Sequence, residues 1–330
     1  MAYIGIDIGS ATFAATFLTD PDHLQVLGEF ENTPDGFKKL LDSLPIPFEG
    51  TLSFVMEATG VYSESLSHFL HSCGFAVYVE PPRRVKRAFY ERGKTDPLDS
   101  RQIAEYGHRF PDQLHPWQPR EAVLEQLRIL ATIKLQYTRM MTSLKNARKA
   151  LQSKHQQYTT AIDLHTQVLS EFKTAGKLLE QEMKTLVKQN LILNQHLANL
   201  QTIPGVGFWI ALNFLLITEG FTMHVNPKHL AAYIGICPYP YESGTSVKRP
   251  PHADSAGPAR LRSLLYLASM TMSKNNPQMH HYYERKVKEG KSKRLVLNNI
   301  ANKLLKLMCA LIEHGKPYDE KFLSVNPNLF

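Results

Sequence analysis

The sequence predicts an α/β domain at the N-terminus, then a long helical coiled-coil segment, then a mostly α-helical domain. Three observations predict this order. Short apolar runs alternate with amphipathic helical patterns over residues 1–115. Apolar residues with 4,3 spacing dominate residues 116–200, and apolar helical runs separated by turns fill much of residues 201–330.

Residues 1–115 contain short apolar runs that are typical of buried strands. These runs lie at 3–8, 12–18, 52–57 and 75–79. An Asn-Thr-Pro-Asp start signal predicts a helix that continues through Leu41, and residues 63–72 carry one apolar helical face. Alternation of strands with helices indicates a sheet that is covered by helices.

Residues 116–200 have the spacing of a coiled-coil seam. Nine positions from Val123 to Leu151 follow the 4,3 pattern, and seven of them are apolar or aromatic. A helix of this length spans about 50 Å. A second apolar helical run extends from Leu179 to Leu200. The pattern is compatible with a helical hairpin, an intermolecular coiled coil or an intramolecular bundle.

The last segment, residues 201–330, reads as a compact helical domain. Helices are expected at roughly 208–219, 227–234, 260–273 and 296–313, with a loop rich in Pro, Ser and Gly at 237–258. Gly205 and Gly207 form a turn that is typical of a helix-hairpin-helix motif, in which backbone N–H groups approach a phosphate. The alternative is a glycine turn that only packs two helices.

The charge balance favours a polyanionic partner. Lys and Arg number 38 against 30 Asp and Glu, which gives a net charge of +8. The basic residues are clustered, as on phosphate-contact surfaces, although a solvated helix face is the alternative for any single run. The clusters contain Arg83, Arg84, Lys86, Arg87, Lys248, Arg249, Lys291, Lys293 and Arg294.

Cysteine usage and hydropathy suggest a cytoplasmic protein. The cysteines Cys73, Cys237 and Cys309 are far apart and form no Cys-x-x-Cys pair, so neither a disulfide framework nor a zinc ribbon is indicated. Asp7 interrupts the N-terminal apolar run, which argues against a signal peptide. No uninterrupted apolar stretch reaches the roughly 18 residues of a membrane span.

Four acidic residues are candidate metal ligands, namely Asp7, Glu57, Asp96 and Asp99. Asp7 lies within an apolar strand and Glu57 ends another, where a carboxylate is costly to bury unless it binds a cation. Asp96 and Asp99 lie one helical turn apart around Pro97, although this pattern also caps helices. Carboxylates suit Mg²⁺, and metal ions stabilise the attacking and leaving oxygens of phosphodiester chemistry.

Ser243 is a candidate nucleophile. It precedes a glycine in a basic loop, and no histidine stands at a spacing that suggests a hydrolase triad. A serine that attacks phosphate needs a base or metal and cationic support. Lys248, Arg249, Arg260 and Arg262 could supply the positive charge.

Together, these residues resemble the insertion-sequence family numbered one hundred and ten and its related site-specific DNA invertases. The matching segments are 5–9, 57–62, 81–86, 94–99, 203–207, 233–236 and Ser243-Gly244. The resemblance covers nearly the whole chain.

The resemblance implies a RuvC-like, RNase H-like N-terminal domain whose tetrad Asp7, Glu57, Asp96 and Asp99 binds Mg²⁺ (or Mn²⁺). It implies that Ser243 attacks DNA and forms a covalent 5′-phosphoserine link, so that strands are exchanged and religated. It further implies a guide non-coding RNA, double-stranded donor and target DNA, and a homo-oligomer, either a dimer or a tetramer. Such a protein would be bacterial and nucleoid-associated, with Lys94 among its nucleic-acid contacts.

One segment departs from the family pattern. After the serine, the family shows Ile-Ser-Lys-x-Gly before a helix with Leu-Arg, whereas residues 248–262 here lack that lysine. The departure leaves Ser246 and Ser255 as rivals to Ser243.

Three other functions remain open on the sequence. A Holliday-junction-type nuclease would use the same acids with water as the nucleophile. A non-enzymatic nucleic-acid-binding protein would show no metal-dependent cleavage. An actin-like kinase shares the first strand and its Gly9-Ser10 turn but needs further glycine-rich nucleotide loops, which are not seen before residue 120.

Overall fold

The computed structural model divides the chain into two compact units, Met1–Pro119 and Arg120–Phe330. The described residues are 1–20, 22–45, 50–89, 96–156, 158–223, 225–243, 247–253 and 257–319. For residues 96–98, 238–243 and 247–253 the description extends to the backbone alone.

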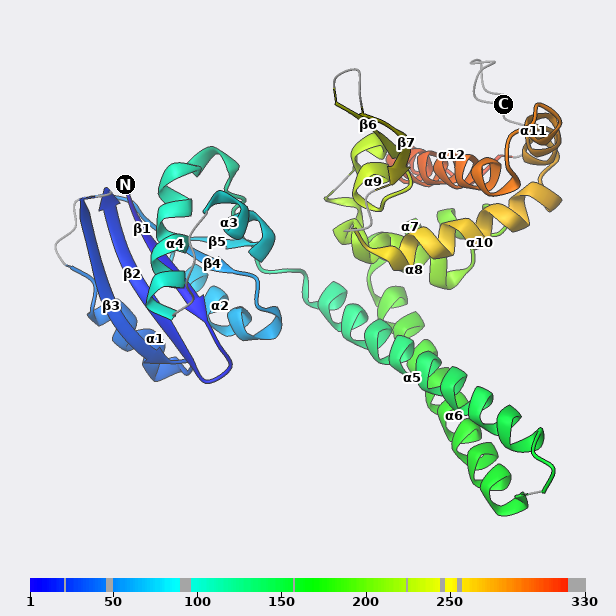
Figure 1. The fold of residues 1–330 in the computed structure, drawn as a ribbon, viewed down its shortest axis with the longest axis horizontal. Helices are drawn as coiled ribbons and strands as arrows, with labels where there is room; N and C mark the ends of the chain where they lie inside the picture. Colours follow the sequence, from blue (N-terminus) through cyan, green and yellow to red (C-terminus); the bar gives the residue numbers. More distant parts are fainter. Residues whose placement is uncertain are drawn as a thin grey trace. The chain divides into compact units, whose positions relative to one another are not determined.

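A five-stranded mixed sheet forms the centre of the first unit (Figure 1). In the order β3-β2-β1-β4-β5, the strands are β3 (His23–Glu31), β2 (Thr12–Asp20), β1 (Ala2–Ile8), β4 (Leu52–Glu57) and β5 (Ala76–Glu80). The first three strands form antiparallel hairpins, and β4 and β5 run parallel to β1. The expected sheet covered by helices is confirmed.

The strand β3 was not predicted from the sequence, and its burial pattern gives the reason. It is an edge strand whose residues are exposed or half-buried, so neither an apolar run nor a strict alternation marks it. The fourth predicted strand, 75–79, is shifted by one residue and ends at Glu80.

Helices cover both faces of the sheet. On one face, α1 (Pro34–Asp42) and α2 (Glu64–Ser72) pack against the apolar side chains of β1 and β4. The predicted start of α1 is confirmed, because the Thr33 side chain accepts a hydrogen bond from the Gly36 N–H and Pro34 is the first helical residue. On the other face lie α3 (Pro82–Ala88) and α4 (Asp96–Arg109).

A long helical hairpin begins the second unit. Its arms are α5 (Ala122–Gln152) and α6 (Thr159–Gln189), of 31 residues each, and they lie side by side (Figure 1). The predicted seam of α5 is its buried or half-buried face, where Tyr137 meets Phe172 with ring centroids 5.2 Å apart. Of the three arrangements that the sequence allowed, the structure has the hairpin within one chain; supercoiling and intermolecular pairing stay predictions.

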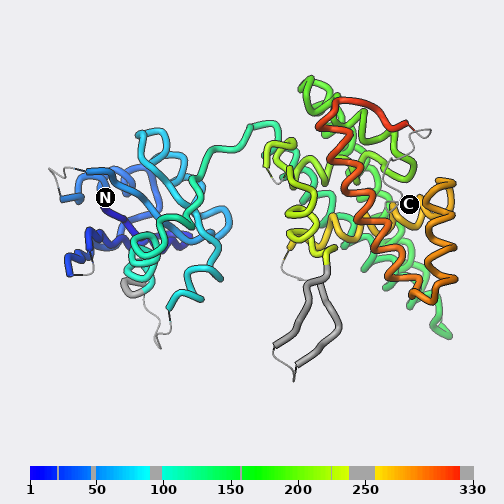
Figure 2. Tube along the Cα trace, turned by 90° about the horizontal axis from the view of Figure 1, so that it is seen from above, coloured from blue at the N-terminus to red at the C-terminus, as the bar shows by residue number. Residues whose placement is uncertain are grey.

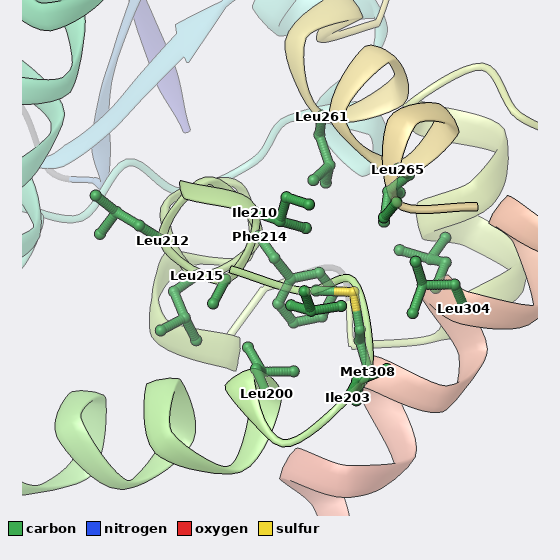
Figure 3. Close-up of a cluster of buried hydrophobic side chains, with 14 of the residues drawn as sticks. Leu200, Ile203, Ile210, Leu212, Phe214, Leu215, Leu261, Leu265, Leu304 and Met308 are labelled. Carbon is green, nitrogen blue, oxygen red and sulfur yellow. The ribbon is translucent and has the colours of Figure 1, made fainter. Parts of the chain in front are cut away.

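The rest of the second unit is a helical bundle. Its helices are α7 (Leu191–Gln201), α8 (Phe208–Ile217), α9 (Pro227–Tyr233), α10 (Ala259–Asn275), α11 (Pro277–Lys288) and α12 (Lys293–His314). The mostly apolar α8 lies inside, and Figure 3 shows its Phe214 in one cluster with Ile203, Leu304 and Met308.

Of the helices in the described part of the chain, α12 alone is long and apolar enough to cross a membrane. Half of its apolar window is nevertheless buried inside the protein, and Val296, Ile300, Leu304 and Met308 belong to the core. This helix is coloured orange to red in Figure 2. Its apolar character is therefore explained by packing within the bundle.

The expectation of a loop at 237–258 was wrong. The chain forms a β-hairpin there, with β6 (Pro238–Ser243) antiparallel to β7 (Val247–Ala253). The prolines that argued against strands are tolerated because each strand of a two-stranded ribbon has a free edge.

Candidate active site

Acidic residues stand at the carboxyl ends of three neighbouring parallel strands. The last residue pair between β1 and β4 is Ile6 with Met56, and Asp7 and Glu57 directly follow it. On the next strand, β5, Glu80 pairs in register with Glu57. Since paired strands lie about 4.8 Å apart, this places the three acids in one row at the end of the sheet.

The helix α4 shows which face Asp7 belongs to. A Cβ atom at Gly5 would lie 2.2 Å from backbone atoms of both Ser100 and Ala104, so the bare side of Gly5 faces α4 directly. Side chains two residues apart on a strand point to the same face. Asp7, which is half-buried, therefore points to the α4 face.

Glu57 belongs to the same face, and α4 runs opposite to β1. A Cβ at Gly107 would lie 2.8 Å from Val55 and 2.9 Å from Tyr3, so Glu57, two residues after Val55, also points toward α4. Because Gly107 lies beside Tyr3 while Ser100 lies beside Gly5, the N-terminus of α4 extends toward the carboxyl end of β1.

This geometry directs the N-terminal turn of α4, where the second pair of predicted acids lies, toward the end of the sheet that carries the first pair. The helix begins at Asp96, about 6 Å along its axis from Ser100. Asp7 is about 7 Å along the strand from Gly5. Asp99 is half-buried, and the Asp96 side chain lies outside the described residues. The structure thus brings Asp7, Glu57 and the first turn of α4 to one end and one face of the sheet.

The donor chemistry of this site fits a hard divalent cation, because carboxylate oxygens are the ligands that Mg²⁺ and Mn²⁺ prefer. Among the described side chains, which exclude that of Asp96, no three His, Cys, Asp or Glu groups are close enough to form a ready metal cluster. Asp7 and Glu57 each take part in further polar interactions.

Glu80 is a site residue that the sequence interpretation missed. Its side chain is 1% exposed, although it carries a carboxylate. Oε2 binds Arg84 Nη1 at 3.2 Å, and Oε1 accepts the backbone N–H of His115 at 3.2 Å. The available signal was its position at the end of an apolar strand, which Glu57 shares, but the predicted strand stopped one residue short.

The basic run that follows Glu80 forms the exposed surface of α3. Arg83, Arg84, Lys86 and Arg87 are all exposed, while Val85 is buried against α4 and the sheet. This arrangement is compatible with the predicted nucleic-acid contacts. Lys94 lies outside the described residues.

In the second unit, Ser243 is the last residue of β6 and pairs with Val247. Lys248 and Arg249 follow on β7, opposite Glu242 and Tyr241. The structure gives their backbones only. Ser246 and Ser255 lie outside the described residues.

Contacts with the bundle fix the base of the hairpin. Arg262 donates from Nη1 to the Ile234 carbonyl at 3.2 Å, and Asn298 donates to the Ile236 carbonyl at 3.0 Å. Gly257 packs so tightly on the Tyr233 backbone that a Cβ would overlap it. Arg262, predicted as a phosphate contact, thus has a structural role at this base.

The two glycines of the predicted helix-hairpin-helix turn have different surroundings. Gly205 has φ 88° and lies against α10, where a Cβ would approach the Ala268 carbonyl at 3.2 Å. Gly207 precedes α8, and a Cβ there would meet nothing within 4 Å. Packing therefore accounts for Gly205, and only Gly207 has open space; phosphate binding by this turn stays a prediction.

The remaining predicted contacts lie at helix starts. Arg260 is exposed in the first turn of α10. Lys291, Lys293 and Arg294 are exposed where α12 begins. Their exposure is compatible with binding a polyanion.

Comparisons with known proteins connect these features. Residues 4–155 match a family model described as Transposase (DEDD_Tnp_IS110), and residues 197–284 match one described as Transposase IS116/IS110/IS902 family. The pilin gene-inverting proteins of Moraxella lacunata and Moraxella bovis are each 28% identical over 325 residues, which is 97% of this chain and 98% of theirs. An insertion element IS110 protein of Streptomyces coelicolor is 27% identical over 165 residues, or 49% of this chain and 40% of that protein.

The two family matches together span most of the chain and include both the carboxylate row and the hairpin whose first strand ends at Ser243. The resemblance drawn from the sequence motifs is therefore confirmed. The chain therefore carries two transposase domains of the IS110 family.

Proposed function

We propose that this protein is a metal-dependent DNA recombinase that uses Ser243 as its nucleophile. One observation carries the proposal, namely the convergence of Asp7, Glu57 and the first turn of α4 at one end of the sheet. The mixed sheet order, with the first acid on its central strand, also supports an RNase H-like, RuvC-like fold for the first unit. The full-length match to pilin gene-inverting proteins supports recombination as the reaction.

Asp7, Glu57, Asp96 and Asp99 would hold Mg²⁺ or Mn²⁺. Bound there, the cation would neutralise charge on the phosphate that reacts. The carboxylate oxygens would supply the ligands of the cation. Placement on a strand end and a helix packed closely against Gly5 gives this set a rigid frame.

Ser243 would attack the phosphorus through its hydroxyl oxygen. The hydroxyl proton passes to a base, the bond from phosphorus to the 3′-oxygen breaks, and the departing 3′-oxygen takes up a proton. The product is a 5′-phosphoserine and a free 3′-hydroxyl. Attack of another 3′-hydroxyl on this ester rejoins the DNA and releases the serine, so each phosphodiester bond is conserved without ATP.

The partners follow from the family resemblance and the basic surface. Double-stranded donor and target DNA are the substrates, a guide RNA selects them, and the protein acts as a homo-oligomer. Support comes from the exposed basic residues on α3 and at the start of α12, which suit phosphate contacts.

A covalent-trapping assay tests the reaction. The protein, RNA transcribed from the flanks of its gene and the matching DNA are mixed with Mg²⁺, denatured and separated on a gel. The expected protein–DNA adduct disappears in Ser243→Ala and in Asp7→Ala. It persists in Asp35→Ala, which removes an exposed carboxylate on the opposite face of the sheet, and in Ser246→Ala and Ser255→Ala.

Two results would contradict this scheme. Loss of the adduct in Ser246→Ala or Ser255→Ala, with Ser243→Ala active, would move the nucleophile. Metal-dependent cleavage without any adduct, unchanged in Ser243→Ala, would establish a hydrolytic nuclease of the Holliday-junction type.

A further inference from the structure

A cavity of about 440 Å³ opens beside α3 and α4, beyond the edge strand β5. This volume is within the range of roughly 300–1,000 Å³ that is typical of small-molecule sites. The described residues that line it combine cationic, aromatic and amide groups. They are Arg84, Arg87, Ala88, Tyr106, Phe110, Gln113 and His115.

The buried Glu80 carboxylate holds one wall of the cavity in place. It binds Arg84 at 3.2 Å and the His115 backbone N–H at 3.2 Å, while the Arg84 side chain stays 48% exposed. A carboxylate that is 1% exposed is stable only with such partners. The Arg84 guanidinium is therefore oriented before any ligand arrives.

A second contact orders His115. Arg84 Nη1 lies 3.2 Å from His115 Nδ1. A guanidinium can only donate, so Nδ1 accepts and the ring proton is on Nε2. The wall then offers hydrogen-bond donors from both residues.

Aromatic rings form another part of the lining. The rings of Tyr106 and Phe110 are 5.4 Å apart and tilted by 43°. Burial, and then the negative charge of Glu80, raise the pKa of Tyr106 above its usual value, so its hydroxyl stays a neutral donor. Aromatic side chains beside arginines are the combination with which proteins hold unstacked bases and their phosphates.

The cavity is adjacent to the carboxylate row. Glu80, which anchors its wall, is the register partner of Glu57 on the next strand and points to the same face of the sheet. A DNA strand held at Asp7 and Glu57 therefore has its neighbouring nucleotides within reach of Arg84 and Arg87.

We propose that this cavity binds a single unstacked nucleotide of the DNA strand next to the reacting phosphate. Arg84 and Arg87 hold its phosphate, and the ring of Phe110 contacts its base. The proposal rests on the proposed function, since it assumes that DNA is the substrate of the carboxylate site.

The basic residues of α3 provide a matched test. Arg84 and Arg87 line the cavity, whereas Arg83 and Lys86, which are on the same short helix and also exposed, do not. Binding of the full chain to a fluorescent single-stranded oligonucleotide, and to its duplex, is measured by anisotropy in EDTA. Arg84→Ala and Arg87→Ala are expected to weaken single-strand binding about tenfold more than duplex binding, while Arg83→Ala and Lys86→Ala weaken both alike.

A second variant guards against misfolding, since Arg84→Ala leaves Glu80 with fewer partners. Phe110→Leu keeps an apolar side chain against the fold but removes the ring, and it is expected to lower single-strand affinity about fivefold or more. The proposal would be overturned if Arg87→Ala and Phe110→Leu left the ratio of single-strand affinity to duplex affinity unchanged. An equal loss in all four α3 variants would also overturn it and would indicate a general basic surface.

The outcome is separable from that of the proposed function. Binding in EDTA needs neither metal nor Ser243. If the cavity variants lose more single-strand binding than duplex binding, as expected, but no covalent adduct forms in the trapping assay, the recombinase scheme fails and the cavity proposal holds. If the adduct forms but the cavity variants bind single strands and duplex as the unsubstituted protein does, the cavity proposal alone fails.

Discussion

Thr16 on β2 and Ser100 on α4 share a hydrogen bond of 2.9 Å between their hydroxyl oxygens in the buried interface. Thr16 pairs in register with Gly5, and the Ser100 carbonyl oxygen is one of the backbone atoms that a Cβ at Gly5 would overlap. The bond thus fixes the height of α4 over the sheet at the residue that directly follows Asp99, one turn after Asp96.

We expect Thr16→Val to reduce the free energy of unfolding of the first unit by about 1 kcal/mol, because the Ser100 hydroxyl loses this buried partner. Thr16→Ser, which keeps the hydroxyl, should reduce the free energy of unfolding by less. The measurement is urea unfolding followed by Trp117 fluorescence in a Trp209→Phe background, where Trp117 is the one remaining tryptophan. A double-mutant cycle with Ser100→Ala that shows no coupling would contradict the prediction.

Gly5→Ala should be more severe. A methyl group there would lie 2.2 Å from backbone atoms of α4, so the helix must move away from β1. We expect a loss of about 3 kcal/mol in the same Trp117 assay, together with loss of metal-dependent cleavage. Gly207→Ala, where the added methyl meets open space, is the control for a glycine-to-alanine change and should leave the stability of the second unit nearly unaltered.

Asp99→Asn distinguishes a metal ligand from a helix cap. As a ligand, Asp99 should be needed for catalysis, so strand cleavage falls by about a hundredfold or more while DNA binding in EDTA is retained. The rate is measured over a range of Mg²⁺ concentrations. If Asp99 only stabilises the N-terminus of α4, the melting temperature falls but the rate at saturating Mg²⁺ does not.

Cys309 should resist alkylation in the folded protein. Burial, reinforced by the nearby Glu313 carboxylate, raises the pKa of this thiol to about 12, so almost no thiolate is present at pH 8. Iodoacetamide followed by mass spectrometry should label the exposed Cys73 and leave Cys309 unmodified. Rapid labelling of Cys309 at pH 8 without unfolding would refute this.

The same shift has a consequence for stability at high pH. The unfolded thiol ionises near pH 9, whereas the folded thiol does not until about pH 12. The favourable contribution is therefore complete below pH 9 and is lost as the pH rises toward 12. Cys309→Ala should flatten this part of the pH profile of the free energy of unfolding.

Long periodic segments were predictable from the sequence because their signal is local. The apolar positions from Val123 to Leu151 identify both the helix α5 and the face that packs on α6. By contrast, β3 exposes most of its side chains, and β6 and β7 contain four prolines, so their pairing is visible only in three dimensions.

The candidate site divides in the same way. The sequence by itself determined which residues are acids at strand ends, since Asp7 and Glu57 interrupt apolar runs at a chemical cost that calls for a cation. Only the tertiary structure decided that α4 runs opposite to β1 and directs its first turn, which contains Asp99, toward their end of the sheet, because that depends on the close contact at Gly5. It alone also placed Glu80 beneath Arg84, since a buried carboxylate is identified by its neighbours in space and not by those in the chain.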